Sequence, residues 1–292
     1  MYEKLEKCPV CGDTGFSNYT ICKDYVVTGE SFALSACDNC GLIFTNPRPV
    51  PELIGKYYNS ENYVPHTGKV TLLTSVYRFF RNFNNRYKIN VINHSAEKGE
   101  LLDVGCGRGN FLEYCSSKGW KVSGVEPVDQ ARNAAEQILG KTIYRNISDV
   151  PADVKFNIIT FWHVLEHIYN IDTVIEKAKN LLAKNGKILI ALPNNESYDA
   201  HEYKEYWAAF DVPRHLYHFN QKSFSYFMKE HGLKIADILP MKLDAFYVSL
   251  LSEKNKNNRK NWVKSFINGY KSNSYAKYNE NNYSSLIYIV KK

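Results

Sequence analysis

The stretch "LLDVGCGRGNFLEY", residues 101–114, decides the fold of this chain. An apolar run ends at Asp103, glycines follow at positions 105, 107 and 109, and a helical pattern begins at Asn110. Glycine permits tight turns and lets the backbone approach a ligand closely. A turn of this kind between a buried strand and a helix is typical of nucleotide-binding α/β sheets. The pattern therefore predicts a cofactor site at the carboxyl end of this strand.

Outward from this stretch, short apolar runs alternate with amphipathic segments. Strands are expected at 99–105, 120–127, 141–147, 155–162 and 187–194, with helices at 110–119, 128–140 and 172–186. One or two more strands are expected within 233–251, and a last strand at 284–292. Such alternation predicts a parallel sheet with helices on both faces, to which the last strand adds antiparallel at the edge.

The charge at the glycine turn discriminates between two classes of cofactor. A dinucleotide fingerprint, G-x-G-x-x-G/A, would place its third small residue where Asn110 stands. A carboxylate about 4 Å from a pyrophosphate would also cost about 4 kcal/mol at an effective dielectric near 20, which argues against phosphate beside Asp103. S-adenosylmethionine instead presents an ammonium and a sulfonium that Asp103 attracts. Glu126 ends the next strand, where an acid can accept hydrogen bonds from ribose hydroxyls.

These stretches, with "GVEP" (124–127) and "FWHVLEHI" (161–168), resemble motifs of the class I S-adenosylmethionine-dependent methyltransferases. The resemblance covers roughly residues 99–250 and implies a Rossmann-like, seven-stranded, mostly parallel sheet. It implies a cofactor at the carboxyl ends of the first, second and fourth strands. The expected cofactor-binding residues are Asp103, Gly105, Cys106, Gly107, Gly109, Asn110, Glu126, Pro127, Asn146, Ile147, Phe161, Trp162 and His163.

Two C-x-x-C knuckles lie near the N-terminus, and their cysteines are Cys8, Cys11, Cys37 and Cys40. Four thiolates make a closed tetrahedral site that suits structural Zn²⁺. The N-terminus lacks the pattern of a secretory signal, which favours metal over disulfides. We therefore predict a zinc-ribbon-like module over residues 1–49; disulfides or a metal-free quartet remain the alternatives. The following residues resemble a module that precedes many methyltransferases of sugar and cell-envelope biosynthesis, which implies a lid or substrate-binding role.

Two further segments complete the predicted organisation. Residues 50–98 are interpreted as a helical connector or lid, in which apolar residues from Leu72 to Val91 recur at helical spacing. Arg78, Arg81 and Lys88 would lie on its opposite, solvated face, or face an anionic lipid or substrate. Residues 99–292 form the cofactor-binding domain, within which 252–282, rich in Asn, Lys, Ser and Tyr, are expected to be a flexible insertion.

The stretch "AAFDVPRHLYHFN", residues 208–220, carries the candidate catalytic groups. It resembles the "PRHLYHF" element of one methyltransferase branch, and in sugar C-methyltransferases a loop histidine matches His215. A histidine is the natural base for an oxygen nucleophile near neutral pH, so His215 is the first candidate and His163 the second. Tyr217 and His218 are further catalytic candidates, and Arg214 could bind an acceptor phosphate or carboxylate.

The net charge of +7 is compatible with anionic small molecules, nucleic acid or a membrane surface. No apolar run suggests a membrane span, and we expect a cytoplasmic protein that makes at most peripheral membrane contact. The expected function is O- or C-methylation of a small or carrier-linked acceptor, such as a sugar, lipid-linked or envelope intermediate. The alternatives are an RNA methyltransferase and a non-catalytic cofactor-binding module. Nucleic acid is disfavoured because Lys and Arg are not concentrated in the cysteine module.

Overall fold

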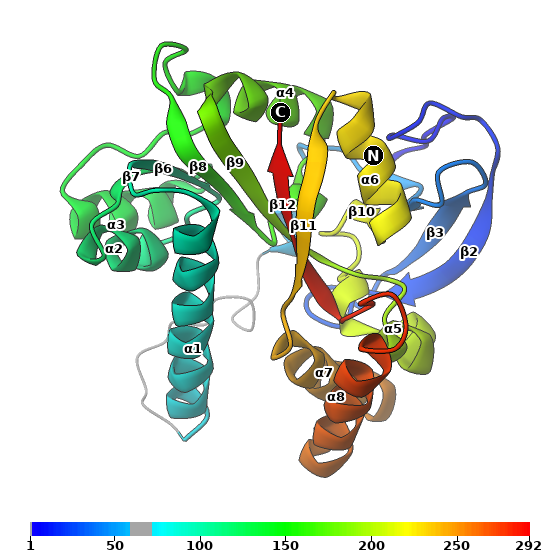
Figure 1. The fold of residues 1–292 in the computed structure, drawn as a ribbon. Helices are drawn as coiled ribbons and strands as arrows, with labels where there is room; N and C mark the ends of the chain where they lie inside the picture. Colours follow the sequence, from blue (N-terminus) through cyan, green and yellow to red (C-terminus); the bar gives the residue numbers. More distant parts are fainter. Residues whose placement is uncertain (1, 59–71) are drawn as a thin grey trace.

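The computed structural model describes residues 2–58 and 72–292, with side chains from residue 84 onward in the first long helix. Its central sheet has six strands in the order β11-β12-β9-β8-β6-β7 (Figure 1). The strands are β6 (Glu100–Val104), β7 (Lys121–Val125), β8 (Phe156–Trp162), β9 (Leu182–Pro193), β11 (Lys234–Pro240) and β12 (Ser285–Lys291). β6 to β9 are parallel, and β12 runs antiparallel to both of its neighbours. The predicted α/β class and antiparallel last strand are confirmed.

Two details of the predicted sheet are wrong. The segment 141–147 does not add a seventh strand, because only Tyr144 bridges to Val125 before the short helix η2 (Ile147–Asp149) begins. The Asp149 carboxylate accepts a hydrogen bond from the Asn146 N–H at 2.9 Å, which turns the chain away from the sheet. β12 also lies inside the sheet rather than at its edge, since its residues from Ser285 to Val290 are all buried.

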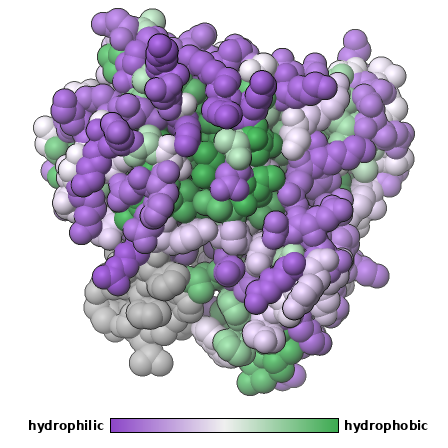
Figure 2. Space-filling view, viewed as in Figure 1, coloured by the Kyte–Doolittle hydropathy of each residue, from purple (hydrophilic) through white to green (hydrophobic). Residues whose placement is uncertain are grey.

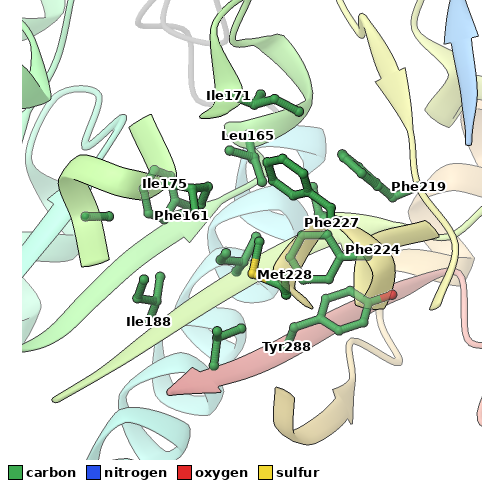
Figure 3. Close-up of a cluster of buried hydrophobic side chains, with 14 of the residues drawn as sticks. Phe161, Leu165, Ile171, Ile175, Ile188, Phe219, Phe224, Phe227, Met228 and Tyr288 are labelled. Carbon is green, nitrogen blue, oxygen red and sulfur yellow. The ribbon is translucent and has the colours of Figure 1, made fainter. Parts of the chain in front are cut away.

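Helices cover both faces of the sheet. α4 (Ile171–Leu181) and α6 (Gln221–Glu230) pack on one face, and α1 (Leu72–Ser95), α2 (Asn110–Ser117) and α3 (Asp129–Leu139) on the other. Figure 3 shows the hydrophobic core on the face of the sheet that α4 and α6 cover. The centroids of the Phe224 and Tyr288 rings lie 4.3 Å apart there. Each large apolar side chain buried in this way contributes about 1.5–3 kcal/mol. None of the helices in the described part of the chain is long and apolar enough to cross a membrane.

The N-terminal module shares a sheet with the loop of residues 208–220, which carries the catalytic candidates. β2 (Phe16–Lys23), β3 (Ser31–Cys37) and β4 (Ile43–Thr45) are joined by β10 (Tyr217–His218), which pairs antiparallel with β4. A two-stranded ribbon of β1 (Tyr2–Glu3) and β5 (Arg48–Pro49) lies beside it. The sheet of the module thus takes one strand from the domain predicted over 99–292, and the predicted division at residue 49 stays a prediction.

The segment expected to be a flexible insertion is helical instead. α7 (Asp244–Asn257) and α8 (Trp262–Ala276) form a hairpin that packs against α5 (Tyr198–Tyr203). The Asn261 side chain caps α8 by accepting a hydrogen bond from the Lys264 N–H at 3.0 Å, which gives this polar sequence a defined helix start. Short helices η1 (Ile54–Tyr57), η3 (Leu165–His167), η4 (Lys204–Tyr206) and η5 (Ala208–Phe210) complete the fold. In α1, the predicted positions of Arg78 and Arg81 lie outside the described side chains.

Candidate functional site

The glycine turn follows β6 and has the backbone conformation that the sequence predicts. Gly105, Gly107 and Gly109 have φ values of +77°, +56° and +80°, a region that favours glycine. The N–H groups of Gly105 and Cys106 both donate to the Val125 carbonyl, at 2.8 and 3.0 Å. A methyl group on Gly105 would lie 2.5 Å from Val164, whereas one on Gly107 would meet no atom within 4 Å. Gly105 is therefore needed for packing, and Gly107 borders open space that a ligand can use.

Asp103 lies at the carboxyl end of β6 with 3% of its surface exposed. Burial raises the pKa of its carboxyl to about 7, although the Thr160 hydroxyl and the Lys88 ammonium act in the opposite direction. The Thr160 hydroxyl donates to Asp103 at 2.6 Å. A cationic ligand beside Asp103 would favour the ionised form, as the predicted role of this residue requires.

Lys88 is a site residue that sequence reasoning missed. It was expected on a solvated helix face, but it is only partly exposed, with its ammonium 4.5 Å from the centroid of the Trp162 ring and 5.5 Å from that of Phe111. Burial lowers its pKa, and the charges of Asp103 and Asp244 oppose this effect. Helical spacing identifies the face that Lys88 occupies, but it cannot show that an acidic site covers this face.

Glu126 directly follows β7, and its carboxylate faces the glycine turn. The N–H groups of Gly107 and Val128 each donate to one of its oxygens at 2.9 Å. These bonds hold the carboxylate in place and leave a second lone pair on each oxygen. The geometry fits the predicted role of Glu126 as acceptor for two ligand hydroxyls.

The other predicted cofactor-binding residues divide into two groups. Asn110, Pro127 and Asn146 are exposed, and Trp162 is partly exposed, so their side chains are accessible. The side chains of Cys106, Ile147 and Phe161 are packed in the hydrophobic core. These three residues would meet a ligand mainly through backbone atoms, and their cofactor-binding role stays a prediction.

A cavity of about 1270 Å³ opens beside the carboxyl ends of β8 and β9. Its lining includes Lys88, His163, His215 and Asp244, together with apolar side chains from α7 and α8. No residue of the glycine turn lines it, but two of its lining residues relate it to that turn: His163 directly follows β8, and the charge of Lys88 lowers the pKa of Asp103. The cavity therefore combines an apolar wall with two of the histidines that the sequence singled out.

His163 lies between two carboxylates. Its Nδ1 lies 3.5 Å from Glu166 and its Nε2 lies 3.3 Å from Asp244. Burial lowers the pKa of His163, but these two carboxylates outweigh burial and raise it to about 9. A protonated imidazole has no lone pair to accept a proton, so these contacts favour His215 over His163 as the base, and the role of His163 stays a prediction.

His215 is held by a different set of contacts. Its Nδ1 lies 2.8 Å from the Ala209 carbonyl, which can only accept, so the neutral ring carries its proton on Nδ1. The lone pair then lies on Nε2, which is 4.0 Å from both Glu166 and Asp211. This geometry agrees with the expectation of a base at His215.

Glu166 is a buried carboxylate at the centre of the histidines. Neither of its oxygens has a hydrogen-bond partner in the described part of the chain. Burial raises its pKa, but His163, His215 and His167 together lower it below the usual value. His167 itself has its pKa lowered to about 4 by burial and by His215. Donor atoms of Glu166, His167 and His215 lie within 4.8 Å of one another, a spacing that would also fit a metal ion.

The remaining loop residues form hydrogen bonds within the protein. Tyr217 donates to the Tyr169 carbonyl at 2.7 Å, and His218 contacts the Thr45 hydroxyl at 3.3 Å. Both side chains are buried and neither lines the large cavity, but both line a small pocket together with Glu166 and His215. Their catalytic role stays a prediction. Arg214 borders the cavity, but its guanidinium is fully buried and paired with carboxylates on both sides. It is therefore not available to bind an acceptor anion.

The cysteine quartet comes together at one point of the module. The sulfurs of Cys8 and Cys40 are 3.6 Å apart, those of Cys11 and Cys37 are 3.4 Å apart, and all four lie within 4.8 Å of one another. Sulfurs around a tetrahedral Zn²⁺ with bonds of about 2.3 Å would be about 3.8 Å apart. The described part of the chain holds all seven cysteines, and none forms a disulfide. The donor set therefore fits a metal ion and excludes the disulfide alternative in this structure.

Comparisons with known proteins agree with this site. Residues 79–238, more than half of the chain, match a family model described as a methyltransferase domain. The chain is 32% identical over 107 residues to a ubiquinone biosynthesis O-methyltransferase of Glaesserella parasuis serovar 5 (strain SH0165), which covers 32% of this chain and 45% of that protein. It is 26% identical over 114 residues to an uncharacterized methyltransferase of Staphylococcus carnosus (strain TM300), covering 38% and 54%. The chain thus spans about half the length of the curated relatives it matches.

Among solved structures, one similar fold is that of a magnesium protoporphyrin IX methyltransferase from Synechocystis PCC 6803 with bound SAH. The TM-score is 0.51 at 13% sequence identity, over 82% of this chain and 98% of that one. At this identity the likeness concerns the fold alone.

Proposed function

The chain belongs to the class I S-adenosylmethionine-dependent methyltransferases, and on this basis we propose that it methylates an oxygen or carbon of a small or carrier-linked acceptor bound beside His215. The observation that carries this proposal is the pairing of a large cavity with a histidine whose Nε2 lone pair is free to accept a proton. S-adenosylmethionine, when bound, supplies the electrophilic methyl group on its sulfonium.

The residues of the chain have separate roles in this proposal. Asp103 and the glycine turn bind the cationic end of the cofactor, and Glu126 accepts hydrogen bonds from its ribose. His215 accepts the proton of an acceptor hydroxyl on Nε2. Glu166 and Asp211, each 4.0 Å from that nitrogen, then stabilise the imidazolium that forms.

His163 has a positioning role in the same cluster. As an imidazolium between Glu166 and Asp244 it offsets the charge of Glu166, which would otherwise be an isolated buried anion. In this proposal one cluster holds a histidine that donates a proton, His163, beside one that accepts a proton, His215. A pair of like side chains with opposite protonation states is a common way to divide donor and acceptor roles.

We further propose that the cysteine quartet holds one structural Zn²⁺. Four sulfur ligands leave no open position for catalysis, so the ion would stabilise the module. The module carries four basic and six acidic residues within 1–49. This charge does not favour RNA binding, so a lid or packing role is the better interpretation.

The test is transfer of a labelled methyl group from S-adenosylmethionine to extracts separated into small-molecule, lipid and RNA fractions. We expect labelling of a small-molecule or lipid fraction, and His215→Ala should slow it by about 10²–10⁴-fold with cofactor affinity unchanged. The matched control is His201→Ala, an exposed histidine on α5, which should retain the wild-type rate. Labelling of RNA alone, or a wild-type rate in His215→Ala, would overturn the proposal.

A further inference from the structure

Helix α8 buries its polar face and exposes its apolar face, which is the reverse of an ordinary surface helix. Its buried face carries Ser265, Asn268, Gly269, Ser272 and Ala276. Surface helices normally turn their apolar side inward. Here small and polar residues face the protein, and the apolar residues must lie elsewhere on the helix.

Specific contacts hold the polar face inward. The Asn268 amide donates to the Tyr203 hydroxyl at 2.7 Å, and the Ser272 hydroxyl donates to Asp199 at 2.7 Å. A methyl group on Gly269 would lie 2.5 Å from the Phe246 ring, so α8 packs closely on α7. The orientation of α8 is therefore determined by its contacts with α5 and α7.

The opposite face of α8 is exposed and apolar. The exposed fractions are 53% for Trp262, 72% for Val263, 65% for Phe266, 46% for Ile267 and 66% for Tyr270. Figure 2 shows hydrophobic residues gathered at the lower end of the molecule, over the α7–α8 hairpin. Each such side chain that stays in water loses the favourable free energy of burial, about 1.5–3 kcal/mol. Contiguous exposed apolar patches mark interaction surfaces.

Basic residues surround this apolar face. Residues 254–277 contain seven Lys or Arg and no Asp or Glu, and the basic positions are Lys254, Lys256, Arg259, Lys260, Lys264, Lys271 and Lys277. The Lys264 Nζ forms an ion pair with Oε1 of the buried Glu253, at 2.8 Å. The other six are exposed. Each basic residue near an anionic membrane contributes about 1 kcal/mol.

We propose that the exposed face of α8 binds an anionic membrane surface and that the acceptor carries an apolar, lipid-like tail. A helix with Trp, Tyr and aliphatic side chains bordered by Lys and Arg has the composition of an interfacial helix. A second copy of this chain is a poorer occupant, because a twofold interface would bring the same cations together. The identity of the acceptor rests on the proposed function, whereas membrane binding does not.

The cavity is continuous with this face. Trp262 and Phe266 belong to the exposed face and also line the cavity, together with Phe246 and Leu251 of α7. His215 lines the same cavity. An acceptor with its tail in the membrane could therefore extend its polar group toward His215 along an apolar wall.

The test is sedimentation of the full chain with vesicles of phosphatidylcholine alone or with 30% phosphatidylglycerol. We expect binding to the anionic vesicles that weakens with salt, and at least a tenfold loss of partitioning in Val263→Ser/Ile267→Ser. Neither of these side chains lines the cavity, so cofactor affinity and thermal stability should be unchanged. Ile138→Ser, at a 40% exposed position on α3, is the matched control and should bind like the wild type.

The proposal is overturned if the wild type does not bind anionic vesicles, or if Val263→Ser/Ile267→Ser binds them equally well. It is also overturned if light scattering shows a dimer that this variant abolishes, because the face would then join two copies. Failure of methyl transfer with intact vesicle binding would count against the proposed function alone. Vesicle binding without any labelled lipid would retain the membrane surface and exclude the lipid-like acceptor.

Discussion

Replacing Arg214 with methionine would break the charge network that joins the catalytic loop to the cysteine module. The Arg214 Nη2 lies 2.9 Å from Asp24 and 2.7 Å from Asp211, and Nη1 donates to the Tyr57 carbonyl at 2.8 Å. The side chains of Arg214 and Asp24 are both fully buried. Methionine retains an apolar stem of similar length, but it leaves Asp24 as a buried carboxylate without its cation.

The expected loss of folding stability in Arg214→Met follows from the burial of this ion pair. Removing one partner of a buried ion pair costs about 3–5 kcal/mol. Asp24 also accepts hydrogen bonds from the Val26 and Thr28 N–H groups, at 3.0 and 2.9 Å, which places the loss near the lower limit. With an unfolding entropy of about 2.1 cal/mol/K per residue, 292 residues correspond to about 0.6 kcal/mol/K. The melting temperature should therefore fall by about 5 °C.

Differential scanning calorimetry measures this shift, with Arg145→Met as the control. Arg145 is 61% exposed and lies 3.6 Å from the exposed Asp129. Exposed pairs of this kind contribute about 0–1 kcal/mol, so the control should shift the melting temperature by less than 2 °C. If Arg214→Met melts within 2 °C of the control, the pair does not join loop and module as argued.

Two further predictions concern the metal and pH. Purified wild-type protein should hold about one zinc ion per chain by elemental analysis, and Cys37→Ser should hold almost none. The control Cys22→Ala should retain its zinc. Wild-type protein without zinc would contradict the proposed zinc site. The His163 pKa of about 9 means that its stabilising effect is complete below about pH 6.5 and is lost as the pH rises through 9. Because His163 is about one-third exposed, wild type should lose about 1–2 kcal/mol more than His163→Asn between pH 6 and 10; equal pH profiles in thermal melts would show that His163 is not paired with Glu166 and Asp244.

The glycine turn and the two acids were predictable because their geometry is local. Glycine at positive φ, an acid at the end of a buried strand and a second acid one unit later depend on residues close in sequence. The C-x-x-C knuckles are predictable for the same reason, since each pair lies within one turn. Arg214 was misinterpreted because its partner Asp24 lies far away along the chain. The surroundings of Lys88 were missed because they depend on how α1 packs beside Asp103 and Asp244.

The sequence by itself determined the class of sheet, the place of the cofactor turn and the cysteine quartet. Only the tertiary structure decided which carboxylates surround each histidine, because these come from α7 and η3. It also decided that β10 completes the sheet of the module and that α8 turns its apolar face outward. Local sequence patterns predict backbone conformation and the composition of each helix face. What each face packs against depends on contacts between segments far apart in the chain.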